Sequence, residues 1–327
     1  MTDLKCPEEE GRAGETRRMD GPGGRIAVVG GRGMLGLDLL ASLERAGFDP
    51  VCLDLAEIDI TDVKSVRSCF EDLAPGLAIN CAAYTAVDRA ESEPDLAFRV
   101  NRDGPANLAG VCDARRIPLI QISTDYVFDG RSQRAYAEDD PPNPLGVYGS
   151  SKWEGEEAVR QRLAEHSIVR TAWLYGVHGQ NFVKTILRLA SEREEMSVVA
   201  DQYGCPTWTV DLAGALTAMA KRIFEDGPAI PWGTCHYCGA GQTTWHEFAE
   251  AIVSEGRQRQ LLKVKRIKRI TTAEYPTAAP RPAWSVLDCA RIESTFGIVR
   301  PQWRTSLSRM IAELNSNGVS IKAAALV

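Results

Sequence analysis

The chain has 327 residues, which is too many for one minimal domain and too few for three, so we expect two lobes around a sizeable core. Hydrophobic residues make up 44% of the sequence and charged residues 25%, and these ordinary proportions exclude a largely disordered or fibrous protein. The net charge of −6 provides no overall positive field for nucleic acid or an anionic membrane, so we predict neither as a partner.

The nine cysteines are odd in number and mostly stand in apolar runs, so we interpret them as reduced, buried side chains. No stretch reaches the roughly 18 apolar residues of a membrane span, and the N-terminus lacks the apolar segment of a signal peptide. We therefore predict a cytoplasmic protein. Cys235 and Cys238 are three residues apart without a second such pair, so we predict no metal site there.

Residues 1–24 combine acidic, basic and glycine residues without apolar periodicity, which predicts a disordered tail. From Arg25 onward, short apolar runs alternate with longer segments of helical periodicity, the pattern of parallel strands joined by crossover helices. This pattern predicts an α/β fold with a Rossmann-type, doubly wound parallel sheet over residues 25–175. The expected strands are Arg25–Gly30, Val51–Leu55, Leu77–Cys81, Leu119–Ser123 and Ile168–Thr171, with a helix over Met34–Gly47 after the first.

After about residue 175 the alternation becomes less regular and proline-rich pieces appear. We expect residues 176–315 to form mainly a smaller, mixed α/β substrate-binding lobe that is interleaved with the first, and residues 316–327 to form a second tail. Between Gly256 and Ile270 the sequence has seven basic residues and no acidic ones. We interpret Lys263–Ile270 as an exposed edge strand protected by charge, with an anion- or partner-binding patch as the alternative.

A glycine-rich turn follows the first expected strand. Gly30, Gly33 and Gly36 stand between the apolar run 26–29 and an amphipathic helix. This context suits the pyrophosphate of a dinucleotide, because bare backbone amides and a helix N-terminus can approach it closely. The spacing Gly-x-x-Gly-x-x-Gly is typical of short-chain dehydrogenases/reductases, and the alternative is a tight turn without a ligand.

The end of the second expected strand carries a further cofactor signal. Asp54 lies where an acid would hydrogen-bond the adenosine ribose, whereas Arg32 in the glycine turn could attract a 2′-phosphate, so NADH and NADPH both stay open. Asp59-Ile60 is a candidate adenine contact. The equal alternative is that Thr61 or Asp62 only caps the next helix.

Tyr148 and Lys152 are four residues apart, so on a helix both side chains project from one face. The lysine charge is expected to lower the pKa of Tyr148, which makes the phenol a better proton donor to a carbonyl oxygen. The pair alone is a weak signal. However, Thr124 ends an expected strand about two dozen residues earlier, where a hydroxyl can hydrogen-bond a substrate carbonyl. The alternative for Thr124 is a helix or turn cap.

Two other groups of residues carry weaker signals. Trp173 follows the last expected strand of the first lobe and could stack on a base or a sugar, but as a single aromatic side chain it suits the core equally well. The four histidines show no ligand spacing, and no serine or cysteine elbow accompanies them, so we propose no hydrolase triad.

Five motifs closely resemble dTDP-4-dehydrorhamnose reductases, over residues 25 to about 312. The last two motifs are much more specific than the glycines and the Tyr–Lys pair of the superfamily. The five are Gly30–Gly36, Asn80–Asp88, Ser123–Gly130, Asp201–Thr207 and Tyr275–Pro282.

The resemblance implies an extended short-chain reductase that uses NADPH or NADH. Its substrate would be a dTDP-linked 4-keto-6-deoxysugar, dTDP-4-dehydrorhamnose, whose C4 ketone is reduced to give dTDP-L-rhamnose. In this comparison Tyr148 donates the proton, Lys152 holds the nicotinamide ribose and tunes Tyr148, and Thr124 hydrogen-bonds the reacting oxygen. Asn101 matches an asparagine that supports a proton relay in related reductases.

The resemblance also implies which residues contact the ligands. The implied substrate contacts are Thr124, Asp125, Tyr126 and Trp173. The implied cofactor contacts are Gly30, Gly33, Met34, Leu35, Gly36, Asp54, Asp59, Ile60, Ala83, Tyr84, Thr85, Ile122, Tyr148 and Lys152. Met34 replaces a more usual glutamine, a change of little consequence where backbone amides bind the ligand. Some relatives require magnesium at a carboxylate cluster between subunits; we identify no such acids here, and predict no metal and a monomer or homodimer.

Two other functions stay open. The first is a sister reductase that acts on another dTDP-4-keto-6-deoxysugar, since the stereochemical outcome depends on how the substrate lies rather than on residue types. The second is a non-catalytic regulatory subunit that resembles the beta subunit of methionine adenosyltransferase, which shares this fold. The presence of Thr124, Tyr148 and Lys152 together argues against the second, because a binding subunit has no need of all three.

Overall fold

A computed structural model describes residues 24–258 and 261–316 of the chain. Within them, six parallel strands form one sheet in the order β10-β5-β4-β3-β1-β2. The chain reverses direction across the sheet between β1 and β3, and ligands of such doubly wound sheets bind at this switch point. The strands are β1 Arg25–Val29, β2 Asp49–Leu53, β3 Leu77–Asn80, β4 Leu119–Thr124, β5 His166–Thr171 and β10 Gly233–His236.

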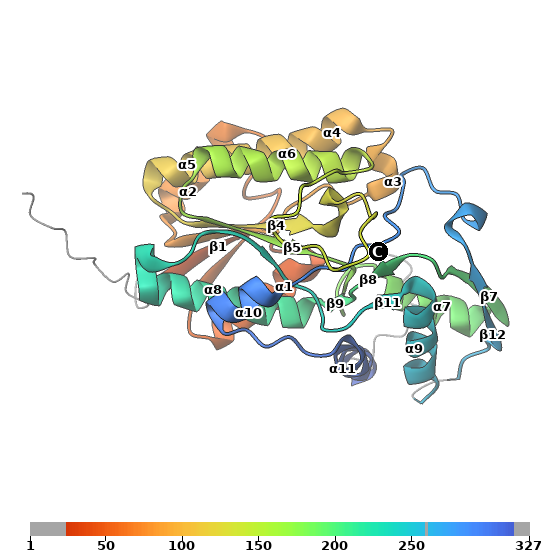
Figure 1. Ribbon diagram of the computed structural model, residues 1–327. Helices are drawn as coiled ribbons and strands as arrows, with labels where there is room; N and C mark the ends of the chain where they lie inside the picture. The colour runs from red at the N-terminus through yellow and green to blue at the C-terminus, as the bar shows by residue number, and fades with distance from the viewer. Residues whose placement is uncertain (1–23, 259–260, 317–327) are drawn as a thin grey trace, which may run out of the picture.

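Helices cover both faces of this sheet (Figure 1). Alternate residues of β1 point to opposite faces: Ile26 and Val28 belong to one hydrophobic cluster, and Ala27 and Val29 to another. Burial on both faces explains why the expected strands are continuous apolar runs. One face is covered by α1 Met34–Arg45, α8 Thr209–Asp226 and α10 Ala290–Phe296, and the other by α2 Val63–Leu73, α5 Gly104–Arg115 and α6 Val147–Arg162.

Short segments join these layers near the carboxyl ends of the strands. Among them, a π-helical turn, η2, interrupts the path from α4 into α5, a feature often found at functional sites. These segments are α3 Val87–Ala90, α4 Pro94–Phe98, η2 Arg99–Asp103 and η3 Asp125–Val127.

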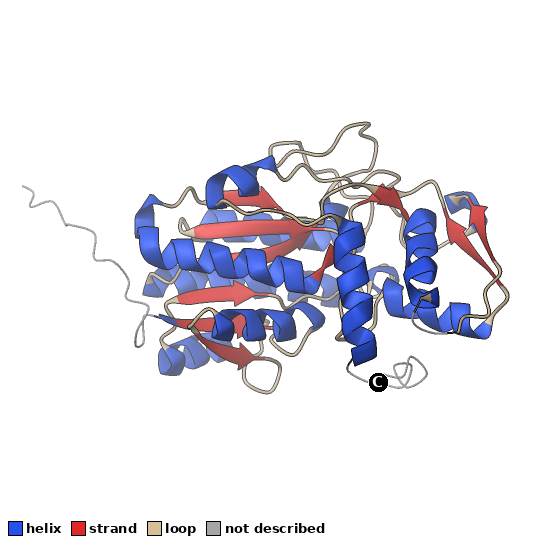
Figure 2. Ribbon diagram, turned by 90° about the horizontal axis from the view of Figure 1, so that it is seen from below, coloured by secondary structure: helices blue, strands red, loops and turns tan. Residues whose placement is uncertain are grey.

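A second, smaller lobe lies beside the sheet and has its own hydrophobic cluster, which includes Tyr175, Phe248 and Trp303. Its strands pair only two by two: β12 with β7, β11 with β8 and β6 with β9. In Figure 2 the β7–β12 pair stands apart from the strands of the sheet. The elements are β6 Leu174–Tyr175, α7 Phe182–Glu192, β7 Glu195–Val199, β8 Tyr203–Gly204, β9 Thr207–Trp208, β11 Thr243–Thr244, α9 Trp245–Arg257, β12 Arg266–Ile270, η5 Thr272–Glu274 and α11 Trp303–Ser316. A short turn of the first lobe, η4 Gly227–Ala229, follows α8 and leads to β10.

The predicted fold class is confirmed. The exposed, charged edge strand is confirmed over Arg266–Ile270, where β12 has mainly exposed residues and pairs with β7 alone, whereas Lys263 to Lys265 precede the strand. The chain returns from its second half to the first lobe through α8, β10 and α10. The division at residue 175 stays a prediction. The predicted tails, 1–24 and 316–327, lie outside the described residues except for Gly24 and Ser316. None of the helices in the described ranges is long and apolar enough to span a membrane.

Candidate active site

The glycine turn forms a cradle between two loops at the switch point. Gly30 has a φ of 75°, and a Cβ on it would lie 2.6 Å from the backbone nitrogen of Ala82. A Cβ on Gly36 would collide with the carbonyl oxygen of Gly30. Gly33 is the N-cap of α1 and places no side chain over the first turn of that helix. Bare amides at a helix N-terminus suit the pyrophosphate of a dinucleotide, so these residues fit the cofactor.

The two residues that follow the turn have different surroundings. Leu35 is buried in the core against the sheet, so only its backbone is available to a ligand. Met34 is half-buried, and its sulfur lies 3.7 Å from the side-chain nitrogen of Asn181. This contact links the cofactor turn to the loop before α7.

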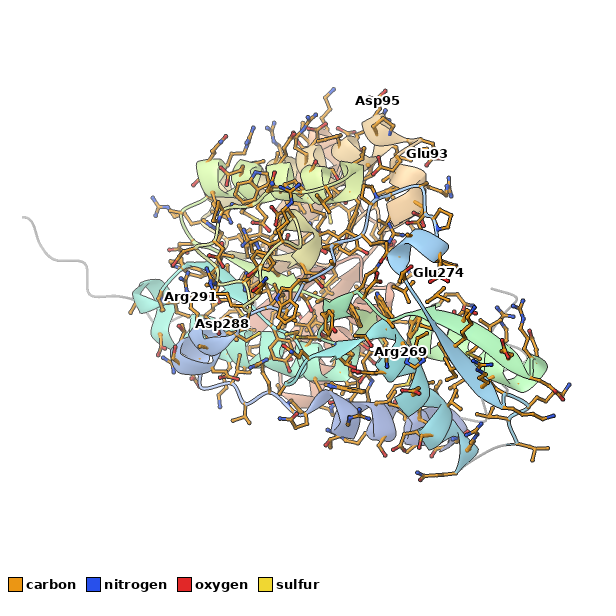
Figure 3. All side chains as sticks on the ribbon, turned by 45° about the vertical axis from the view of Figure 1, so that its right-hand side comes forward. Glu93, Asp95, Arg269, Glu274, Asp288 and Arg291 are labelled. Atoms are coloured by element: carbon orange, nitrogen blue, oxygen red, sulfur yellow. The ribbon has the colours of Figure 1, made fainter. Side chains whose placement is uncertain are left out.

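The loop after β3 is held by a buried asparagine of the π-helical turn. Asn101 accepts a hydrogen bond from the Tyr84 backbone N–H at 2.8 Å and donates to the Tyr84 carbonyl at 3.0 Å and to Ser151 Oγ at 3.0 Å. It therefore ties the loop that contains Ala83, Tyr84 and Thr85 to helix α6. The Tyr84 hydroxyl donates to the Glu93 carboxylate at 2.5 Å. In Figure 3, Glu93 lies beside α4 on the side of the sheet, far from Arg269 of β12 in the second lobe.

At the end of β2, three charged side chains form a connected group. Asp54 Oδ2 accepts a hydrogen bond from the Arg32 backbone N–H at 3.0 Å. The Arg32 guanidinium is bound by both carboxylate oxygens of Glu57, at 2.6 and 2.7 Å. Glu57 Oε2 also accepts from the Asp54 N–H at 2.9 Å. The hydrogen bonds from Arg32 and Asp54 lower the pKa of Glu57 to about 2, so this carboxylate is ionised at neutral pH.

The segment 59–62 mainly forms local contacts. Asp62 is the N-cap of α2 and accepts from the Lys64 N–H at 2.9 Å, so the capping alternative holds for Asp62. Asp59 accepts from the backbone and the hydroxyl of Thr61. Ile60 is buried, and its carbonyl accepts from Asn107 Nδ2 at 2.9 Å. An adenine contact by Asp59 or Ile60 stays a prediction.

The predicted catalytic residues converge where β4 ends and α6 begins. Thr124 is the last residue of β4, and Tyr148 and Lys152 lie in the first two turns of α6. Helix α6 packs closely here, because a Cβ on Gly149 would collide with the carbonyl oxygen of Tyr126. The rings of Tyr126 and Tyr148 consequently meet edge to face, with centroids 5.5 Å apart.

Burial controls the protonation of this corner. Lys152 is only 4% exposed, and its Nζ donates to the carbonyl of Ile122 at 2.7 Å. Burial lowers the pKa of Lys152 to about 8, against the opposing effects of Glu156 and Cys81. Burial raises the pKa of Tyr148 to about 12, although its hydrogen bond with Thr124 opposes this change. The expected decrease in the Tyr148 pKa is therefore not found: desolvation of the phenolate is the largest effect, and Lys152 is not among the groups that shift this pKa. The phenol is neutral at pH 7, as a proton donor must be.

Asp125 contributes a buried carboxyl group beside Thr124. Thr124 Oγ1 donates to Asp125 Oδ1 at 3.1 Å, whereas Asp125 Oδ2 has no hydrogen-bond partner among the described residues. Burial raises the pKa of Asp125 to about 6, and the nearby hydroxyls of Ser285 and Thr124 oppose the increase. The Ser285 hydroxyl itself donates to the Tyr203 carbonyl at 3.3 Å, so Asp125 Oδ2 stays without a hydrogen-bond partner in the described part of the chain. Ser285 follows the Tyr275–Pro282 motif by three residues, so the second half of the chain contributes to this part of the site.

Behind the catalytic corner lies an ion pair that the sequence analysis missed. Arg170 on β5 binds both oxygens of Glu156 on α6, with a shortest distance of 2.7 Å, and both side chains are at most 1% exposed. Ser123 Oγ donates to the same carboxylate at 2.5 Å. Burial would raise the pKa of Glu156, but the charge of Arg170 and these hydrogen bonds hold it below its ordinary value. In the sequence, the only sign of this ion pair was an acidic residue, Glu156, four positions after Lys152 and therefore on the same face of the helix.

Trp173 lies where the two hydrophobic clusters meet. Its ring stacks on Trp245 with centroids 3.5 Å apart, and Gly204 packs against it so closely that a Cβ there would collide with the indole. Its backbone has a φ of 51°, a strained value for tryptophan. These contacts favour the core alternative, and a sugar contact by Trp173 stays a prediction.

The described cysteines are all free. Those at 112, 205, 235, 238 and 289 are buried, as expected, whereas Cys52, Cys69 and Cys81 are only partly buried. Cys238 Sγ lies 3.6 Å from Cys289 Sγ rather than beside Cys235. No group of three or more His, Cys, Asp or Glu in the described ranges is arranged to hold a metal ion.

A glycine cradle at the switch point, an acid at the end of β2 and a Thr–Tyr–Lys corner on one doubly wound sheet define an extended short-chain dehydrogenase/reductase. The chain matches the family described as RmlD substrate binding domain over residues 24–316. It is 43% identical to the dTDP-4-dehydrorhamnose reductase of Sinorhizobium fredii, over 90% of this chain and 99% of that protein.

Solved structures agree with this similarity. The crystal structure of a dTDP-4-dehydrorhamnose reductase from Clostridium acetobutylicum has a TM-score of 0.82 and 39% identity, and covers 89% of this chain and 99% of that one. A Bacillus anthracis dTDP-4-dehydrorhamnose reductase in complex with NADP has a TM-score of 0.82 and 37% identity, with coverages of 88% and 99%. The chain therefore belongs to the dTDP-4-dehydrorhamnose reductase family and is an NAD(P)-dependent oxidoreductase. The predicted family and cofactor class are confirmed.

Proposed function

We propose that this protein reduces the C4 ketone of dTDP-4-dehydrorhamnose with NADPH or NADH, giving dTDP-L-rhamnose, and that Tyr148 donates the proton. The observation that carries this proposal is the convergence of Thr124, Tyr148 and Lys152 at the carboxyl end of β4, on the same edge of the sheet as the glycine cradle. The substrate is that of the relatives, which are dTDP-4-dehydrorhamnose reductases by name.

The bound nicotinamide supplies a hydride to C4 of the ketone. Tyr148 transfers its phenolic proton to the ketone oxygen, and the neutral state that burial maintains makes this proton available at pH 7. Thr124, whose hydroxyl donates to Asp125 Oδ1 in this structure, would redirect that one proton to the same oxygen when the ketone binds. Lys152 stabilises the resulting phenolate and binds the nicotinamide ribose, which requires its charged form.

Asp125 and Tyr126 are proposed substrate contacts. The free Oδ2 of Asp125 can accept a hydrogen bond from a sugar hydroxyl, because the atom is buried at the end of β4 without a partner among the described residues. Trp173 is also a proposed substrate contact, through the part of its ring that neither stacks on Trp245 nor packs against Gly204. A monomeric or homodimeric protein in the cytoplasm stays our expectation.

The test is NAD(P)H oxidation with the product of coupled dTDP-glucose dehydratase and epimerase as substrate, followed by NMR of the sugar product. We expect oxidation at a rate far above that of Tyr148→Phe, and a rhamno-configured product. A different configuration at C4 would indicate the sister reductase. Cofactor binding without oxidation above the Tyr148→Phe rate would indicate the non-catalytic subunit.

A further inference from the structure

We propose that Glu57 is a cofactor-selecting residue: it holds the Arg32 guanidinium away from the 2′-phosphate of NADPH and so favours NADH. This inference rests on the proposed function only in that a nicotinamide dinucleotide binds the glycine cradle. It assigns a role to a side chain outside the expected set of cofactor contacts.

The carboxylate of Glu57 is fixed in place from two directions. Its Oε2 accepts a hydrogen bond from the Asp54 N–H at 2.9 Å, and its own backbone N–H donates to the Asp54 carbonyl at 2.8 Å. Glu57 therefore cannot follow Arg32 toward a ligand without breaking this turn. Arg32 is the more exposed partner, with 54% of its side chain exposed against 34% for Glu57, and its guanidinium has no other hydrogen-bond partner among the described residues.

The ion pair with Glu57 occupies the two terminal guanidinium nitrogens of Arg32, which a phosphate would also need. An arginine binds a carboxylate or a phosphate with the same planar pair of N–H donors, and Glu57 occupies both end nitrogens at 2.6 and 2.7 Å. Arg32 can bind a 2′-phosphate only by giving up these bonds, or by holding the phosphate next to a second anion.

The local charge favours the same cofactor. Asp54 and Glu57 each contribute a negative charge and Arg32 one positive charge, so the group at the end of β2 is net negative. A ribose 2′-hydroxyl can donate to the Asp54 carboxylate, whereas a 2′-phosphate beside it would be repelled. Without Glu57, Arg32 would balance Asp54 and leave a free guanidinium for the phosphate.

The test measures dissociation constants for NADH and NADPH by the fluorescence of the reduced nicotinamide, without a ketosugar. We expect the wild-type protein to bind NADH at least as tightly as NADPH. In Glu57→Gln the affinity for NADPH should rise about tenfold relative to NADH, because Arg32 becomes free to form charge-assisted hydrogen bonds. Arg32→Ala added to Glu57→Gln should remove this gain, and Arg32→Ala alone should change the ratio less than twofold.

Glu71→Gln is the matched control, since Glu71 forms an exposed pair with Arg115 at 2.5 Å between α2 and α5. The ratio of its dissociation constants for NADH and NADPH should equal that of the wild-type protein. The proposal is overturned if Glu57→Gln changes the ratio no more than this control, if the double variant keeps the gain, or if Arg32→Ala alone weakens NADPH binding tenfold. Cofactor binding with the expected ratios but no reduction of any dTDP-ketosugar would refute the proposed function and support the role of Glu57.

Discussion

Two bidentate arginine–carboxylate pairs stand near opposite ends of the cofactor region. They differ chiefly in burial, and the inner carboxylate, Glu156, also binds a second arginine, Arg160, at 2.8 Å. Glu156 and Arg170 lie behind the catalytic corner and are at most 1% exposed. Glu57 and Arg32 lie at the ribose end and are 34% and 54% exposed. The inner pair joins α6 to β5 in a medium that penalises every unpaired charge, whereas the outer pair is solvated and can exchange partners.

The comparison shows that an arginine–carboxylate ion pair can serve two purposes, depending on its burial. At the inner corner, burial decides protonation and rigidity, so its charges matter for stability and proton transfer. At the outer corner, water screens the charges, so their arrangement matters mainly for which ligand binds. Four predictions test this contrast, and the test of Glu57 examines the outer corner directly.

The largest effect is expected from Tyr148→Phe at the inner corner. Removal of the phenolic proton should lower kcat/KM about 10²–10⁴-fold, the usual contribution of a general acid. The affinity for NADH should stay within about twofold, because the ring and its edge-to-face contact with Tyr126 remain. Steady-state kinetics and cofactor fluorescence measure the two quantities. A decrease in kcat/KM below tenfold would assign the proton to another group.

Arg170→Met should reduce the free energy of unfolding by about 1–3 kcal/mol, because the buried Glu156 carboxylate loses its buried partner and keeps only the ion pair with Arg160 at 2.8 Å and the hydrogen bond from Ser123. Urea unfolding measures this loss. The matched change at the outer corner, Arg32→Met, should leave the urea midpoint unchanged within error. Adding Glu156→Gln to Arg170→Met should recover part of the loss. Equal midpoints for the two single variants would contradict the contrast between the pairs.

Asp125→Asn should stabilise the protein at pH 7 by about 1–3 kcal/mol while it raises KM for the ketosugar. The folded-state pKa of Asp125 is raised to about 6, above the ordinary 3.8, so the folded state binds the extra proton between these values. The stability that this proton contributes is lost as the pH rises through 6, and an amide avoids that loss. Paired urea titrations should show the gain at pH 7 and almost none near pH 4; a destabilised variant at pH 7 would refute this account.

The smallest effect is expected in the pH dependence of kcat/KM. The pKa of Lys152 is lowered to about 8, and the charged lysine is the active form, so kcat/KM should fall as the pH rises through 8 and be about tenfold lower at pH 9. The groups that face Lys152 are Glu156 on α6, Cys81 after β3 and the Ile122 carbonyl on β4. Cys81→Ala should move the decline only slightly. A profile that stays flat to pH 9.5 would exclude Lys152 as the titrating group.

Local patterns were sufficient for the fold and for the centre of the site. The glycine turn after Val29, the continuous apolar strands and the Tyr–Lys spacing on one helix each depend on neighbours within a few residues, and short-range geometry alone dictates them. The edge strand within Lys263–Ile270 could also be predicted, because exposed sheet edges usually have charged side chains and this segment is rich in basic residues.

Only the tertiary structure decided which residues far apart in the sequence are in contact, and how deeply those contacts are buried. Arg32 reaches Glu57 over 25 positions, Ser285 reaches Asp125 from the other half of the chain, and Trp173 stacks on Trp245. The pKa of Tyr148 depends on the same information: the sequence predicted a decrease caused by Lys152, but burial of the phenol raises this pKa instead. Residue type and spacing determine which reaction a site can catalyse. Burial and long-range partners determine the protonation states of its residues and the ligand that it prefers.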